Sequence, residues 1–284
     1  MLKQRVITAI VLLAMLLPAL FYPRPEPFAA LSLVMIAAAA WEWSRLNGVN
    51  GLGAIGMALA VVAACAVAWA LGGLAQPWPA LWGMVSLLWV AGGAALLRAG
   101  VAGWSRIPVW LRLAAGMAAL WAAWLAIAQA RVTGVGFLLS VLTLVWMADI
   151  GAYFAGRAFG LRWTRSRLAP SISPGKSWEG VWGGMAGVLL LAYAWGGVAA
   201  RTQAGDTSLY TQLAQHGWWA VGIAALVLAA MSVVGDLVES LVKRSAGVKD
   251  SSALLPGHGG VLDRIDALLP TLPLAMMLST WAHA

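Results

Sequence analysis

Apolar runs of about 20 residues recur from one end of this chain to the other, and they constrain its fold more than any other feature. Each run is long enough to cross a hydrocarbon core of about 30 Å as an α-helix. Apolar residues make up 62% of the 284 residues. Charged residues make up only 10% of the chain, against roughly 25% in soluble domains. The sequence therefore predicts an all-α, polytopic integral membrane protein.

The apolar pattern divides into about nine spans. The first resembles the charged and hydrophobic regions of a signal peptide, because Lys3 and Arg5 precede its apolar run. The run is long, and no small-x-small site closes it before Pro23, so we expect a retained first helix. The expected spans cover residues 1–22, 27–44, 51–73, 78–98, 108–130, 133–155, 178–200, 217–240 and 261–282.

An odd number of spans places the two ends of the chain on opposite sides of the membrane, so counting basic residues tests the orientation. With a cytoplasmic N-terminus, all 18 Lys and Arg residues except Arg24, Arg131 and Arg201 fall on the cytoplasmic side. We therefore expect a cytoplasmic N-terminus, with the loops around 156–177 and 241–260 on the same side. This bias explains the net charge of +8, which then gives no reason to expect a nucleic-acid partner.

One stretch near the C-terminus, residues 235–266, holds half of the chain's ten acidic residues. These charges adjoin apolar runs, where an unpaired charge is costly. Asp236 and Lys243 are seven residues apart and share one helix face, and Asp263 and Asp266 are three apart and can point the same way. The spacing therefore predicts converging carboxylates beside a basic residue at one membrane edge.

A glycine-rich turn, residues 256–260, separates the helix with Asp236 and Lys243 from the segment with Asp263 and Asp266. Glycine permits positive φ and close approach to a ligand, and backbone N–H groups ahead of a helix N-terminus suit an anion. Carboxylates beside a phosphate site indicate Mg²⁺. A salt-bridge network that only joins two helices stays open as the alternative. Glu42 ends the second span, and the sequence leaves open whether it is a structural partner for an Arg or has a supporting role.

The loop around 156–177 is basic, and it ends in a Ser-Pro-Gly-Lys-Ser turn at 173–177. The turn offers hydroxyls, backbone donors and one Lys, but it lacks the glycine spacing of a Walker loop, and we expect no strand before it. Four arginines of the loop suit either substrate or anionic lipid head groups. They are Arg157, Arg162, Arg165 and Arg167.

The polar positions of these segments resemble one known family. The C-terminal pattern reads Ser240-x-x-Lys243-Arg244-x4-Lys249-Asp250, then Leu255-Pro256-x-His258-Gly259-Gly260-x-x-Asp263-Arg264-x-Asp266. It resembles the signature of phosphatidate cytidylyltransferases, also called CDP-diacylglycerol synthases. Asp149, the 173–180 segment and Gly235-Asp236 are similar to bacterial members as well, whereas residues 40–145 match only in hydrophobic character. One departure is Gly175-Lys176-Ser177, where the family pattern has Lys-Lys-Thr.

The resemblance implies cytidylyl transfer from CTP to phosphatidate, giving CDP-diacylglycerol and pyrophosphate for phospholipid biosynthesis. It implies a multi-pass protein of the bacterial inner membrane with its active site facing the cytoplasm. Residues 1–284 would form one integral domain, with N-terminal helices in 1–145 and catalytic helices and loops in 146–284. CTP, phosphatidate and membrane lipids are the expected partners, and a homodimer is one open option.

The resemblance also implies roles for individual residues. The expected catalytic residues are Asp236, Lys243, Arg244, Lys249, Asp263, Arg264 and Asp266. The expected substrate-binding residues are Ser173, Lys176, Asp250, His258, Gly259, Gly260 and Asp149. Mg²⁺, with room for a second cation, is expected on Asp236, Asp263 and Asp266.

Two rival functions use the same charges differently. A CTP-dependent kinase of another membrane lipid, such as a polyprenol or phytol kinase, is the nearer one, and the complete His-Gly-Gly-x-x-Asp-Arg-x-Asp run argues against it. A cation-coupled secondary transporter predicts midplane acids and inverted repeats, whereas these acids crowd one membrane face and no repeat is visible. Acyl preference and the residues that contact cytosine stay open.

Overall fold

The computed structural model describes residues 2–202 and 207–283. Within those residues, nine helical segments are long and apolar enough to span a membrane, which confirms the all-α, nine-span prediction. The first seven are α1 (Leu2–Phe21), α2 (Glu26–Leu46), α3 (Gly51–Ala70), α4 (Pro79–Arg106), α5 (Val109–Thr133), α6 (Val135–Phe159) and α7 (Trp178–Thr202). The short α8 (Leu209–Ala214) precedes α9 (Trp218–Ser245), and the last span is broken into α10 (Leu262–Ile265) and α11 (Leu268–Ala282).

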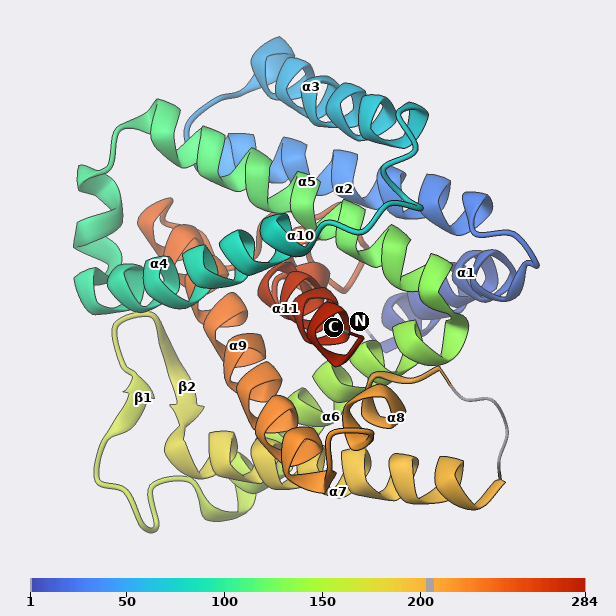
Figure 1. The fold of residues 1–284 in the computed structure, drawn as a ribbon. Helices are drawn as coiled ribbons and strands as arrows, with labels where there is room; N and C mark the ends of the chain where they lie inside the picture. Colours follow the sequence, from blue (N-terminus) through green and yellow to red (C-terminus); the bar gives the residue numbers. More distant parts are fainter. Residues whose placement is uncertain (1, 203–206, 284) are drawn as a thin grey trace.

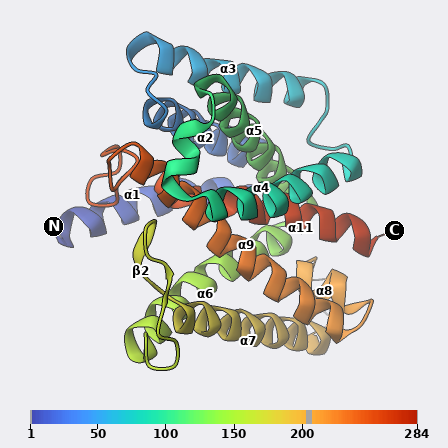
Figure 2. The ribbon, with the colours of Figure 1, turned by 90° about the vertical axis from the view of Figure 1, so that its left-hand side faces the viewer.

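The helices form one bundle in which α11 is surrounded by other helices (Figure 1). A view at right angles places the start of α1 and the end of α11 at opposite ends of the bundle, as an odd number of spans requires (Figure 2). The N-terminal turn of α1, the loop 246–261 and a hairpin before α7 lie together at one end, and α8 lies at the other. We call the first of these ends the loop face. The basic loop and the charged stretch thus share one side of the bundle.

That hairpin was not expected from the sequence. It pairs β1 (Arg167–Ala169) with β2 (Ser173–Ser177) in antiparallel register. The prediction that no strand precedes the Ser-Pro-Gly-Lys-Ser turn was therefore wrong. A strand of three residues without alternating apolar positions leaves no periodic signal in a sequence. Arg167 contributes to the pairing by donating from its guanidinium to the carbonyl of Pro174.

Small residues determine how closely the helices of the second half approach one another. A Cβ at Gly184 of α7 would lie 2.6 Å from the carbonyl oxygen of Ala148 in α6. A Cβ at Gly235 of α9 would lie 2.4 Å from the carbonyl oxygen of Asp266. Backbones that pack this closely leave no room for a side chain. Gly235 therefore allows Asp266 to lie directly beside α9.

Candidate active site

A cavity of about 630 Å³ lies between α6, β2, α7 and α9. Its charged lining comes from Asp149 and Arg157 on α6, Lys176 on β2 and Asp236 on α9. Asp149 and Arg157 are eight residues apart on one helix, which corresponds to ~12 Å along its axis. The cavity therefore extends from the loop face into the membrane-spanning part of the bundle. Apolar and aromatic side chains, including Tyr153, complete its walls.

Asp236 is the carboxylate around which the polar part of the cavity is arranged. Lys176 forms an ion pair with it, and the Ser240 hydroxyl donates a 3.3 Å hydrogen bond to its Oδ1. The side chains of Lys176 and Asp236 are 27% and 32% exposed, so a ligand can reach both. Asp149 and Asp266 each lie within electrostatic range of Asp236. Two of the expected acids, Asp149 and Asp236, thus line the cavity beside a lysine, and Asp266 lies near Asp236 without lining it.

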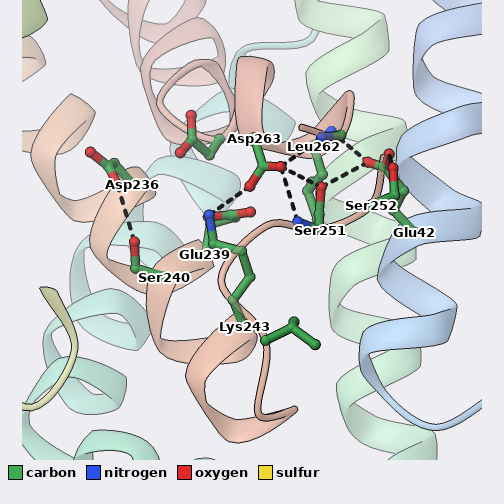
Figure 3. A network of polar contacts seen from close by, with 12 residues as sticks. Glu42, Asp236, Glu239, Ser240, Lys243, Ser251, Ser252, Leu262 and Asp263 are labelled. Atoms are coloured by element: carbon green, nitrogen blue, oxygen red, sulfur yellow. Dashed lines mark hydrogen bonds and ion pairs between the residues drawn. The ribbon is translucent and has the colours of Figure 1, made fainter. Parts of the chain in front are cut away.

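Asp263 belongs to a second, buried network that lies next to Asp236 and includes Glu239 and Lys243 of α9 (Figure 3). Lys243 lies between two carboxylates, 2.5 Å from Glu239 and 2.6 Å from Asp263. The other oxygen of Asp263 accepts from the backbone N–H and hydroxyl of Ser251 at 3.0 and 2.9 Å. It also accepts from the N–H of Gly260 at 2.7 Å. Asp263 therefore links the glycine turn to α9 through four hydrogen bonds.

Glu42 is the residue whose place in this network sequence reasoning missed. It is completely buried on α2. Its carboxylate accepts from the backbone N–H groups of Val261 and Leu262 at 2.9 and 2.6 Å. It also accepts from the hydroxyls of Ser251 and Ser252 at 3.2 and 2.5 Å. The suggestion that Glu42 pairs with an Arg was therefore wrong, because its partners are four neutral donors.

A buried acid in an apolar span signals that hydrogen-bond donors lie nearby, and this signal is present at Glu42. The donors themselves lie more than 200 residues away along the chain. Neither helical period nor local spacing relates positions at such a separation, so the sequence could not identify them.

The remaining expected residues lie at the loop face in different surroundings. Arg244 donates to the carbonyls of Ile172 and Val248, at 3.3 and 3.1 Å, and so ties the hairpin to the end of α9. His258 is half-buried, and its Nδ1 has no hydrogen-bond partner among the described residues. Gly259 adopts a left-handed backbone with φ of 85°. Ser173 begins β2 and is half-buried, while the exposed residues of the set are Lys249, Asp250 and Arg264.

The expected metal ligands do not form a closed cage. Across residues 2–202 and 207–283, no three His, Cys, Asp or Glu side chains converge as a metal site would require. Asp236 and Asp266 lie within electrostatic range of each other, whereas both oxygens of Asp263 already accept hydrogen bonds. Mg²⁺ takes only one or two carboxylates when a phosphate supplies further oxygens. Asp236 at the cavity and the nearby Asp266 are therefore a suitable pair of carboxylates for Mg²⁺.

Comparison with known proteins identifies the family of this chain. The model of the cytidylyltransferase family matches residues 3–281. The chain belongs to the cytidylyltransferase family. It is 39% identical to the phosphatidate cytidylyltransferase of Pseudomonas aeruginosa, across 99% of this chain and 98% of that protein. It is 36% identical to the phosphatidate cytidylyltransferase of Haemophilus influenzae, across 96% of each chain. The resemblance drawn from the polar motifs is thereby confirmed, and it now includes the N-terminal half.

Proposed function

We propose that this protein transfers the cytidylyl group of CTP to phosphatidate, giving CDP-diacylglycerol and pyrophosphate. The observation that carries the proposal is similarity over nearly the whole chain to two phosphatidate cytidylyltransferases. The cavity is compatible with both substrates. Its charged end, with Lys176 and Arg157, suits phosphates, and its apolar walls extend into the span, where a lipid approaches.

The reaction needs alignment and charge neutralisation more than proton transfer. A phosphate oxygen of phosphatidate attacks the α-phosphorus of CTP, the bond from that phosphorus to the bridging oxygen breaks, and pyrophosphate leaves. A phosphomonoester has its second pKa at about 6, so the nucleophile is already ionised at neutral pH. A general base is therefore unnecessary, and preorganised positive charge is the main requirement.

The basic side chains have two proposed positions. Lys176 and Arg157 line the cavity and neutralise phosphate there. Lys249 and Arg264 are exposed on the loop face, where they attract the triphosphate and the departing pyrophosphate. Lys243 and Arg244 act mainly by positioning, because their donors are directed to Asp263 and to backbone carbonyls.

Mg²⁺ is proposed on Asp236 and Asp266, with Asp263 as a further ligand once its Oδ1 gives up the hydrogen bond from Lys243. When bound, it would offset the negative charge of the triphosphate. Asp236 suits this role because its carboxylate lines the cavity and is accessible to solvent. Lys176, its present partner, can then move to a phosphate oxygen.

The loop face is proposed to be cytoplasmic. The basic residues of the hairpin, the loop 246–261 and the N-terminal turn gather there, and such a bias favours the cytoplasmic side (Figure 2). CTP would enter from that side, and phosphatidate from the adjoining leaflet of the bacterial inner membrane.

Membranes containing the protein, supplied with labelled CTP and Mg²⁺, test the proposal. Label should enter the lipid extract only when phosphatidate is added, and EDTA should abolish the transfer. Asp263→Asn should also abolish it while the protein remains folded in the membrane, because the amide weakens the bond to Lys243. Equal labelling of the lipid extract with and without added phosphatidate would refute the proposed acceptor. Near-normal activity of Asp263→Asn would refute the role of Asp263.

A further inference from the structure

We infer that Glu42 of α2 is a positioning residue for the active site, acting through the loop 250–262. The part of this inference that concerns catalysis rests on the proposed function. Glu42 lines no part of the cavity between α6, β2, α7 and α9. Its effect on the reaction must therefore pass through the residues that it holds.

Four donor groups lie within hydrogen-bond distance of Glu42, two at each carboxylate oxygen, and one of them, the single hydroxyl proton of Ser251, is shared with Asp263. Oε1 accepts from the Ser252 hydroxyl and the N–H of Val261, and Oε2 accepts from the Ser251 hydroxyl and the N–H of Leu262. The N–H groups at a helix start have no partner within the helix. A carboxylate from a different helix satisfies two of them here, where α10 begins.

The connection to Asp263 runs through two neighbours. Ser251 Oγ lies 3.2 Å from Glu42 Oε2 and 2.9 Å from Asp263 Oδ2, so one hydroxyl lies between the two carboxylates. Gly260 donates its N–H to Asp263 Oδ2 at 2.7 Å. The next residue, Val261, donates its N–H to Glu42. A shift of Glu42 would therefore move two of the groups that hold the Asp263 carboxylate, the Ser251 hydroxyl and the N–H of Gly260.

The position requires a carboxylate specifically. All four partners are donors, and two of them are backbone N–H groups that cannot reverse their role. A glutamine amide has one oxygen and an NH₂ group, so at least one of the N–H groups of Val261 and Leu262 would face another donor. A buried N–H without an acceptor is destabilising, and the start of α10 would move to relieve it.

The test compares Glu42→Gln with Glu26→Gln, because Glu26 is an exposed acid on the same helix. Both full-length proteins are purified in detergent and examined by hydrogen exchange, thermal unfolding and steady-state kinetics with CTP and phosphatidate. For Glu42→Gln we expect faster amide exchange confined to residues 250–262. The kcat should fall roughly tenfold to a hundredfold, as expected for a misplaced site or an unpaired donor. The KM for CTP should stay within about twofold, because the cavity walls are untouched. Glu26→Gln should match the wild type in every respect.

Three results would overturn the inference. Normal kcat despite faster exchange would mean that Glu42 is only structural, and unchanged exchange would mean that it does not hold the loop. A uniform loss of thermal stability with kcat and KM changed together would mean a general folding defect. If Glu42→Gln does not fold, Ser252→Ala removes a single donor and should reduce kcat in the same direction by about twofold to tenfold. An unaltered kcat in that variant would also refute the inference.

The exchange measurement separates this inference from the proposed function. A wild-type protein that transfers no cytidylyl group to phosphatidate would refute the proposed function. Amide exchange in residues 250–262 would still decide, in the same preparations, whether Glu42 holds the loop.

Discussion

Gly260→Ala would add one methyl group at the point where Glu42 and the glycine turn meet. A Cβ at this position would lie 2.0 Å from Ser251 Oγ and 2.5 Å from Glu42 Oε1. Both separations are far inside van der Waals contact. Gly260 is not among the glycines with positive φ, so alanine can adopt the backbone conformation. The effect of the substitution would come from volume alone.

The magnitude follows from two costs. Inserting a methyl group into a packed site costs about 1–3 kcal/mol. If Glu42 moves aside, a buried N–H at the start of α10 loses its acceptor, at about 1–3 kcal/mol more. Together these destabilise the loop by about 2–6 kcal/mol. Since 1.36 kcal/mol corresponds to a factor of ten in rate, even the lower limit predicts a kcat reduced at least about tenfold.

The assay measures kcat together with proteolysis of the loop 246–261 in detergent-solubilised protein. Gly260→Ala should lower kcat and accelerate cleavage within that loop. Gly197→Ala is the matched control, because a Cβ there meets no atom within 4 Å and alanine favours the helix. A Gly260→Ala protein with wild-type kcat and wild-type protease resistance would refute the reasoning.

Two further substitutions test other parts of the site. Lys176→Met removes the cation paired with Asp236 and should raise the KM for CTP roughly tenfold, since hydrogen bonds to charged groups contribute about that much. Lys176→Arg should be intermediate, and an unchanged KM in Lys176→Met would exclude Lys176 from CTP binding. Thr8→Val removes a 2.9 Å hydrogen bond from α1 to the carbonyl of Pro256. It should speed proteolysis of the loop by about twofold to fivefold, and equal rates would contradict the idea that α1 supports the turn.

The helices could be predicted because apolar runs leave a strong signal over about 20 residues. Boundaries were less accurate where helices continue beyond the apolar run. The helix α9 extends to Ser245, past the predicted end at 240, because Leu241 and Val242 are buried and Arg244 bonds to the hairpin. The helix α4 extends to Arg106 across a kink at Gly100, whose φ is 66°. The hydrophobic pattern does not predict that a helix continues across a kink.

The contacts of the candidate site are also of two kinds, those within one helix, which could be predicted, and those between distant segments, which could not. Asp236 and Lys243 could be predicted because polar residues at helical spacing on one apolar span share a face. The ion pair between Lys176 and Asp236 joins β2 to α9, and the bonds of Glu42 join α2 to residues near the C-terminus. These pairings depend on how distant helices pack, and a single sequence carries no periodic signal for them.

The most direct test of the central claim follows which phosphate of CTP enters the lipid. Membranes containing the protein are given phosphatidate, Mg²⁺ and CTP labelled at either the α-phosphate or the γ-phosphate. Cytidylyl transfer predicts that the α-label appears in the lipid fraction and the γ-label in pyrophosphate. A γ-label in the lipid fraction would identify a CTP-dependent lipid kinase instead and would contradict the account.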